Sequence, residues 1–309
     1  GYEINPLWIR YSPGVVPAIY WIIQMLTEIE DSVALMSPVY YPFANAIRDT
    51  SRTLVDVPLV KDENGYYTMD LESFEATVQK KDVRLFILCS PHNPVGRVWH
   101  EEELRNLLDV CRRNGVYVIA DEIHHDLIMP GQRQITAAAA GDYDSILITL
   151  TSASKTFNLA SCQNAMAIIP NDALRAKYDA MTRRIKTQSG SSFGYVAYEA
   201  AFRGGKEWLE QAIRLIYGNY QILVKGLKQK LPEAVVSPLE GTYLAWVDLS
   251  AYLSERDTER TIRDVCNLAV DFGEWFGRNK YENFIRVNLA TSPDNVRQIV
   301  ARLDRINTL

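Results

Sequence analysis

The sequence has little cysteine, and the cysteines it has show no pairing pattern. Cys89, Cys111, Cys162 and Cys266 are far apart and include no CxxC pair. Small secreted domains that depend on disulfides carry many closely spaced cysteines. The scarcity excludes a disulfide scaffold, favours buried structural thiols and leads us to expect a cytoplasmic protein.

Strong charge of one sign and long apolar runs are also missing. The net charge is −5 with both signs scattered along the chain, so no basic stripe is available for nucleic acid or an anionic membrane. A membrane-spanning helix needs roughly 20 mostly apolar residues. The best stretch, residues 15–26, is shorter and contains Pro17 and Gln24. With no recognisable secretory signal either, we expect neither nucleic acid nor membrane as a partner.

What is present is ordinary for a folded protein. Hydrophobic residues make up 47% and charged residues 23% of the 309 positions. A chain of this length can bury about 75% of its extended surface. The sequence begins at Gly1 and reaches an apolar strand pattern at residues 8–11 almost at once. We therefore expect that an N-terminal segment is missing from it.

The chain up to about residue 170 alternates short apolar runs with helical patterns. The helical patterns start at Val15 and cover 101–113. The strand patterns lie at 8–11, 32–36, 83–89, 116–120, 145–150 and 165–169. Such alternation predicts an α/β fold with a mostly parallel sheet covered by helices. We expect residues 1–215 to form this large domain.

The rest of the chain has a different pattern. A long helical stretch covers residues 208–231, strand patterns follow at 241–246 and 284–288, and helical spacing returns at 294–305. This order predicts a smaller α+β domain, residues 216–309, joined through a helix instead of a flexible linker.

Polar segments directly follow several apolar runs, which is where ligands bind in open α/β sheets. Each segment alone fits a strand-to-helix turn, because Pro, Gly, Ser and Asn are typical turn residues. The segments are Ser-Pro-Gly at 12–14, Ser-Pro-Val-Tyr at 37–40, Ser-Pro-His-Asn-Pro-Val-Gly at 90–96, Asp-Glu-Ile-His at 121–124 and Thr-Ser-Ala-Ser-Lys at 151–155. Together with a late arginine, Arg286, their order and spacing resemble those of the fold type I aminotransferases over essentially the whole chain.

Fold type I aminotransferases use pyridoxal 5'-phosphate (PLP), so the resemblance assigns Lys155 and Ser152 to the cofactor. Lys155 would form a Schiff base with PLP, which requires an amine whose pKa is lowered in a desolvated pocket. Ser152 would donate to the cofactor phosphate. The alternative for Lys155 is an ordinary surface lysine.

The resemblance also assigns roles around the cofactor ring. The Asp121 carboxylate would pair with the pyridine nitrogen and keep the ring an electron acceptor. Asn93 would hydrogen-bond the phenolic oxygen, and Tyr40 would stack on the ring. The alternatives are a helix cap for Asp121, a turn residue for Asn93 and a packed aromatic for Tyr40.

Two further groups of residues would hold anions. Gly14 would allow close approach of the backbone, so that the amides of Val15 and Val16 at a helix start bind the phosphate. Arg286, within a strand pattern, would bind the α-carboxylate of the amino acid through its planar fork. The alternative for Arg286 is a position on the solvent face of the strand.

A narrower resemblance rests on the segment after Asp121. Most aminotransferases carry tyrosine three residues after this aspartate, whereas this chain has His124. Asp-Glu-Ile-His, together with Ser-Pro-Gly-Val-Val at 12–16, Pro-Val-Tyr-Tyr-Pro-Phe at 38–43 and Gly-Thr-Tyr-Leu-Ala-Trp at 241–246, resembles the cystathionine β-lyase (carbon–sulfur lyase) branch that includes MalY and PatB. His124 is then a cofactor-binding residue. We expect no metal site, because no carboxylates are suitably spaced with His124 and His125.

Two departures from the family pattern concern the phosphate and the N-terminus. Gln163 stands where the wider class often has a cationic phosphate ligand. The family's chains extend further at the N-terminus, where an arm covers the active site and a tyrosine reaches the partner subunit's phosphate. The resemblance thus implies a homodimer and a shortened chain.

The function that the resemblance implies is β-elimination. A sulfur amino acid would lose a thiol and yield pyruvate and ammonia, with Lys155 and Asp121 as the catalytic residues. Transamination between an amino acid and a 2-oxo acid stays open, since it passes through the same carbanion. A regulatory protein that retains PLP but acts through a surface partner is the second alternative.

Overall fold

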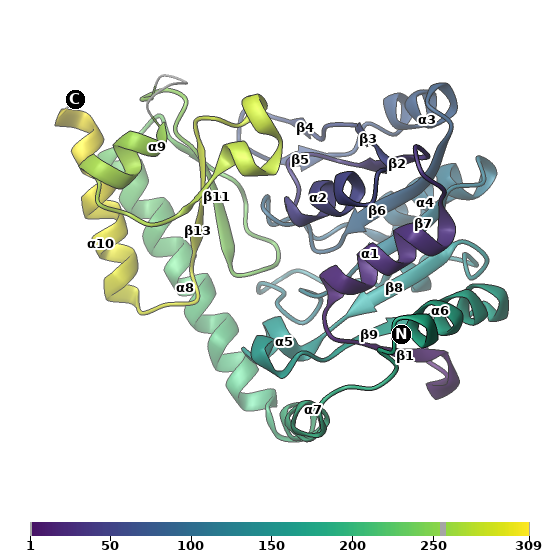
Figure 1. Cartoon of the computed structure of the whole chain (residues 1–309). Helices are drawn as coiled ribbons and strands as arrows, with labels where there is room; N and C mark the ends of the chain where they lie inside the picture. Colours follow the sequence, from purple (N-terminus) through teal and green to yellow (C-terminus); the bar gives the residue numbers. More distant parts are fainter. Residues whose placement is uncertain (1, 254–257, 309) are drawn as a thin grey trace.

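A seven-stranded sheet forms the centre of the larger part of the molecule (Figure 1). The computed structural model describes residues 2–253 and 258–308. The five strands β8, β7, β6, β2 and β3 are parallel, whereas β9 is antiparallel to β8, and β1 to β9. The sheet order is β1 (Ile9–Ser12), β9 (Ala165–Ile168), β8 (Leu147–Thr151), β7 (Tyr117–Asp121), β6 (Val83–Cys89), β2 (Ser32–Leu35) and β3 (Thr53–Asp56). The predicted mostly parallel sheet is confirmed.

Helices cover both faces of this sheet, which explains why residues 85–89 of the inner strand β6 are all apolar. In β6, Leu85 and Ile87 pack towards α1 (Val15–Leu26), α2 (Pro42–Asp49) and α6 (Asp172–Arg184). Phe86 and Leu88 point the other way, towards α3 (Leu71–Lys80) and α4 (Glu101–Arg113). Side chains alternate between the faces of a strand, so a strand buried on both sides shows no polar alternation.

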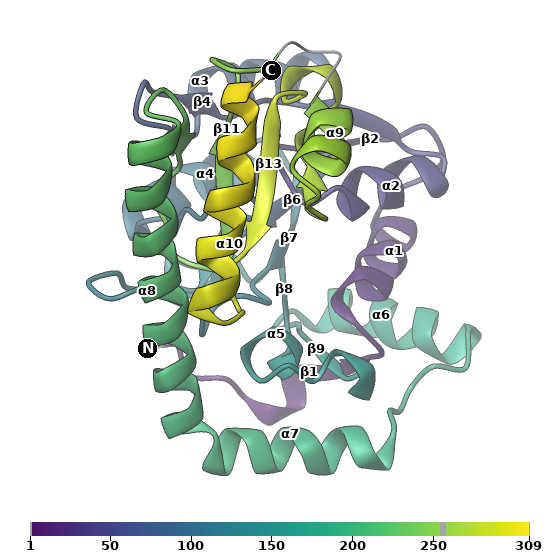
Figure 2. The same ribbon diagram turned by 90° about the vertical axis from the view of Figure 1, so that its left-hand side faces the viewer.

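A second, antiparallel sheet lies in the C-terminal part. Its strand order is β10 (Val235–Val236), β11 (Leu244–Asp248), β13 (Phe284–Asn288) and β12 (Asp271–Phe272). Two helices, α8 (Lys206–Lys230) and α10 (Pro293–Leu303), share one apolar cluster with it. Figure 2 shows α7 (Ser192–Gly204) running across the base of the molecule, with α8 rising from its end beside α10.

The remaining elements are short. They are the hairpin β4 (Val60–Lys61) and β5 (Tyr67–Thr68), helices α5 (Ala153–Thr156) and α9 (Thr258–Arg260), a π-helical segment at Thr261–Val265, and 3-10 helices at Pro6–Trp8, Ala137–Ala139, Ala160–Cys162, Gly273–Phe276, Arg278–Lys280 and Asp304–Thr308. Within the two described ranges, no helix combines the length and apolar character that a membrane crossing needs.

The predicted boundaries differ from the observed ones at informative places. The helix predicted over 101–113 and the strands over 83–89 and 284–288 match α4, β6 and β13. The strand predicted over 241–246 begins only at Leu244. Residues 241–243 form a loop instead, because the Gly241 amide donates to the Gly96 carbonyl (2.9 Å) and the Thr242 amide donates to the Leu127 carbonyl (2.8 Å).

The division into domains of residues 1–215 and 216–309 remains our proposal. The proposed boundary falls inside α8, which continues without a break from Lys206 to Lys230. Leu127 and Met129, from the first part of the sequence, belong to the apolar cluster of the second part.

Two glycines of α8 provide a matched test of how this helix packs. A Cβ at Gly226 would lie 2.7 Å from a methyl carbon of Val300 in α10, whereas a Cβ at Gly218 would meet no atom within 4 Å. Alanine is favoured over glycine inside helices by about 1 kcal/mol. We therefore expect Gly218→Ala to raise the free energy of unfolding by up to about 1 kcal/mol. Overpacking should make Gly226→Ala lower it by about 1–3 kcal/mol. Urea unfolding measures both, and equal effects of the two variants would contradict this packing.

Candidate active site

A cavity of about 350 Å³ opens at the carboxyl ends of the strands of the large sheet. The parallel strands β6, β7 and β8 all end at this edge, so the segments after them converge there. Side chains from the second sheet close the opposite wall. The ten predicted site residues all line this cavity: Gly14, Val15, Val16, Tyr40, Asn93, Asp121, His124, Ser152, Lys155 and Arg286.

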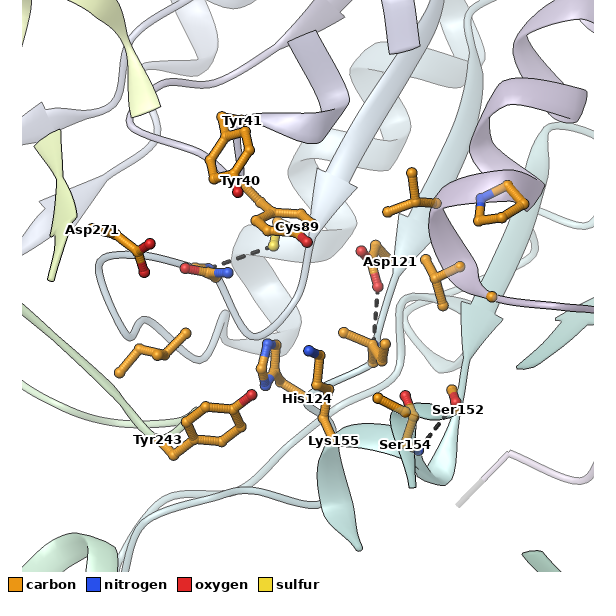
Figure 3. A pocket seen from close by; sticks show the side chains of 18 of the residues that line it. Tyr40, Tyr41, Cys89, Asp121, His124, Ser152, Ser154, Lys155, Tyr243 and Asp271 are labelled. Atoms are coloured by element: carbon orange, nitrogen blue, oxygen red, sulfur yellow. Dashed lines mark hydrogen bonds between the residues drawn. The ribbon is translucent and has the colours of Figure 1, made fainter. Parts of the chain in front are cut away.

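Lys155 projects into the centre of the cavity from α5, a single turn that follows β8 (Figure 3). Ser152 caps this turn, since its Oγ accepts a hydrogen bond from the Ser154 amide at 3.1 Å. Lys155 is half-buried. Among the described residues its amine has neither a hydrogen-bond partner nor an ion pair. An amine held in this way is available for covalent chemistry.

Asp121 is the last residue of β7 and is buried. Its Oδ1 accepts a hydrogen bond from the Ile123 amide at 3.1 Å. Burial raises the pKa of Asp121 to about 7, although this hydrogen bond and the charge of Lys155 act in the opposite direction. A cation in contact with the carboxylate would favour the ionised form. The carboxylate thus suits a cationic ring nitrogen.

The raised pKa of Asp121 predicts how the cofactor-free protein responds to pH. The folded state holds this proton up to about pH 7, whereas the unfolded state loses it near the ordinary aspartate pKa of 3.8. The stability contributed by the protonated group is therefore complete below pH 3.8 and is lost as pH rises to about 7. Asp121→Asn cannot ionise, so its advantage over the wild type should grow across this range. It should then level off at a few kcal/mol. Thermal or urea unfolding at several pH values measures it, and a pH-independent difference would contradict the shift.

His124 presents a neutral ring to the cavity. It is buried, and Nδ1 has no hydrogen-bond partner within residues 2–253 and 258–308. Burial, together with the nearby charges of Lys155 and Arg286, lowers the pKa of His124 to about 3. The ring packs edge-on against Tyr243, with centroids 5.5 Å apart. An unpartnered buried nitrogen is costly unless a ligand satisfies it, so this atom suggests a missing polar group in the cavity.

Arg286 extends from β13 into the cavity, and its guanidinium already donates hydrogen bonds to two side chains. Its Nη1 donates to Asn93 Oδ1 at 2.8 Å, and its Nε donates to Asp271 Oδ2 at 3.0 Å. Antiparallel pairing of β12 with β13 sets Asp271 directly opposite Arg286. Sequence reasoning did not identify Asp271, because the two residues are fifteen positions apart and only the strand register brings them together.

The start of α1 forms one end of the cavity. Gly14 precedes the helix and makes no side-chain cap. The first amides of a helix lack partners inside it, and Pro17 has no amide hydrogen. Val15 and Val16 therefore supply the free donors, which suit a phosphate.

Ser152, which also lines the cavity, donates a hydrogen bond from its hydroxyl to the Asn164 carbonyl at 2.8 Å. The Tyr198 hydroxyl of α7 contacts both Ser152 Oγ and the Asn164 carbonyl. Gln163 is exposed and is not among the residues that line the cavity. Tyr198 carried no sequence signal, because α7 lies in no recognised motif.

The aromatic wall consists of Tyr40 and its neighbour Tyr41, whose ring centroids are 5.5 Å apart. Burial and the nearby Tyr41 and Asp121 raise the pKa of Tyr40 to about 12, so its hydroxyl stays protonated. Below it, Cys89 at the end of β6 is buried, and burial raises the pKa of its thiol. Cys89 was expected to be a structural thiol, and it contributes an unreactive surface to the cavity.

The residues present fit PLP. Among the described residues, the fit rests on two buried groups, the Asp121 carboxylate, which forms no ion pair, and His124 Nδ1, which has no hydrogen-bond partner. Asp121 would hold the ring nitrogen, Lys155 the aldehyde carbon, and Val15 and Val16 the phosphate. In the described part of the chain, no group of three or more His, Cys, Asp or Glu side chains could hold a metal ion.

The chain is similar to known proteins over nearly its whole length. The family model of aminotransferase class I and II matches residues 5–303. Cystathionine beta-lyase PatB of Bacillus subtilis (strain 168) is 36% identical over 309 residues, which cover 98% of this chain and 79% of that protein. Protein MalY of Escherichia coli (strain K12) is 31% identical over 304 residues, with 97% and 76% covered. The crystal structure of cystalysin from Treponema denticola, which contains a pyridoxal 5'-phosphate cofactor, matches with a TM-score of 0.96 at 31% identity. That match covers 99% of this chain and 78% of the cystalysin chain.

Proposed function

Because the chain belongs to the aminotransferase class I and II family, we propose that it is a PLP-dependent carbon–sulfur β-lyase. It would eliminate a thiol from a sulfur-containing amino acid such as cystathionine or cysteine, and water would hydrolyse the remaining three-carbon fragment to pyruvate and ammonia. The observation that supports this best is one cavity in which an unpaired lysine amine, a buried carboxylate and an arginine from another sheet meet. The relative PatB, named a cystathionine beta-lyase, favours elimination.

The chain's own residues divide the work of the reaction. Bound PLP supplies an electron-withdrawing ring that stabilises negative charge at the substrate α-carbon. Arg286 binds the substrate carboxylate and fixes the orientation of the α-carbon. Lys155, freed when the substrate amine replaces it at the cofactor, would then accept the α-proton on Nζ as a general base. Asp121 would favour a cationic ring nitrogen, while Tyr40 and His124 would contact the ring.

Transamination is the second candidate. The whole family is described by that activity, and the same proton transfer at Lys155 would begin it. The difference between the two reactions is the fate of the electrons after the proton is removed, since a leaving group at the β-carbon permits elimination.

An assay of both products distinguishes the candidates. The PLP-loaded protein should release pyruvate from cystathionine or cysteine without any added 2-oxo acid. Amino-group transfer that depends on an added 2-oxo acid, with no pyruvate from either substrate, would overturn the lyase proposal. In that case the family assignment would stand and the aminotransferase would be the better description.

We also propose that the protein is a cytoplasmic homodimer. The exposed apolar side chains of α7 support the dimer, because Phe193 is 86% and Val196 is 67% exposed. Residues three apart lie on the same side of a helix, and exposed apolar surface of this kind commonly marks interfaces. Light scattering coupled to size-exclusion chromatography should give twice the monomer mass.

A further inference from the structure

One carboxylate in the cavity has no part in the chemistry described so far. Asp271 accepts hydrogen bonds at Oδ2 from both Nε and Nη2 of Arg286, the first at 3.0 Å. Both side chains line the cavity, and Figure 3 shows Asp271 on the side away from Asp121. The Asp271 side chain is 35% exposed against 11% for Arg286, so the carboxylate stays accessible to a ligand.

Asp271 occupies one of the two edges that Arg286 can offer to a carboxylate. A guanidinium presents parallel N–H pairs along its Nε–Nη2 edge and its Nη1–Nη2 edge. Asp271 fills the first edge, while Asn93 accepts from Nη1 at 2.8 Å. A substrate carboxylate is therefore restricted to the Nη1–Nη2 edge. There it lies beside a fixed negative charge.

The pairing also sets the charge of this part of the cavity. Arg286 and Asp271 neutralise each other, so the first bound carboxylate already adds one negative charge. A second carboxylate on the same substrate would be repelled by two negative charges, that of Asp271 and that of the first carboxylate. Arg286 offers it no additional positive charge. Repulsion between like charges a few ångströms apart in a partly buried site changes affinity about tenfold or more.

We propose that Asp271 is a specificity-determining residue that selects against amino acids with an anionic side chain. The inference rests on the proposed function, in which Arg286 binds the α-carboxylate, and it deepens it by naming the substrate class. That class is α-amino acids whose distal group is neutral, zwitterionic or cationic. A distal ammonium group meets a complementary charge in Asp271, whereas acidic amino acids are disfavoured.

Binding of two unreactive acids to the PLP-loaded protein tests the inference without turnover. Propionate carries one carboxylate and succinate carries two, and isothermal calorimetry gives both affinities. The wild type should bind succinate no more tightly than propionate. Asp271→Asn, which keeps the shape and removes the charge, should raise the succinate-to-propionate affinity ratio about tenfold. High salt should narrow this difference.

Asp271→Glu is the matched control, because it keeps the charge and should keep the wild-type ratio. An unchanged ratio in Asp271→Asn, or an equal rise in Asp271→Glu, would overturn the inference while the proposed function stands. Arg286→Ala should weaken both acids. If it weakens neither, the assigned role of Arg286 fails, and the inference that depends on it fails as well.

Discussion

Lys155→Ala should yield a protein that has lost the yellow, borohydride-reducible chromophore of the PLP-loaded wild type. Its kcat should fall by about a hundredfold to ten-thousandfold, the usual contribution of a positioned general base. Within residues 2–253 and 258–308, no other lysine lines the cavity to replace it. Because the Lys155 amine has no hydrogen-bond or ion-pair partner among the described residues, its removal breaks no polar contact within the protein. The free energy of unfolding of the cofactor-free protein should therefore change by no more than about 1 kcal/mol.

Lys177→Ala is a suitable control for this variant. Lys177 is an exposed lysine of α6 that does not line the cavity. It should keep the chromophore and the full rate. If Lys155→Ala retained a borohydride-reducible chromophore, the cofactor would be bound through another amine, and the assignment of Lys155 would be wrong.

Arg286→Ala should lower kcat/KM by about thirtyfold to several thousandfold. Truncation of one partner of a partly buried, hydrogen-bonded charge pair typically costs about 2–5 kcal/mol of binding, and about every 1.4 kcal/mol is tenfold. The substrate carboxylate loses the guanidinium that binds it, and the Asp271 carboxylate loses its ion-pair partner. Most of the change should fall on KM, while the chromophore persists because Lys155 and Asp121 are intact.

The Arg286→Lys variant tests whether substrate binding needs only a positive charge or also the planar shape of the guanidinium. Lysine keeps the positive charge but offers a point charge in place of the planar fork. It should recover only part of the loss in kcat/KM. Recovery of the full rate would show that the bidentate geometry is unimportant, and loss of the chromophore in either variant would show that Arg286 supports the cofactor instead.

Much of the cavity could be predicted because its residues belong to local segments. Asp121 ends an apolar strand and Lys155 lies in the turn of helix that follows the next one, and the carboxyl edge of a parallel sheet brings such positions together. Their positions relative to the strands therefore predicted that they would meet. Arg286 could be found from the family pattern, since it stands within a single recognisable strand.

Other features depend on contacts between distant segments, which a single sequence does not encode locally. Asp271 meets Arg286 only through the register of β12 on β13. Tyr198 meets Ser152 only because α7 returns beneath the large sheet. Residues 241–243 directly precede an apolar run and were predicted to belong to its strand, but the amides of Gly241 and Thr242 donate to the carbonyls of Gly96 and Leu127 instead.

The amine and the guanidinium of the cavity are carried by different sheets, Lys155 after β8 and Arg286 within β13. An α-amino acid in the cavity would therefore contact residues from both sheets, which have separate hydrogen-bond ladders. The spacing of the two sheets then sets where the substrate carboxylate lies relative to the α-carbon at which Lys155 acts. A primary amine without a carboxylate would make no contact with Arg286, so its α-carbon would not be oriented. It should therefore be turned over much more slowly than an α-amino acid.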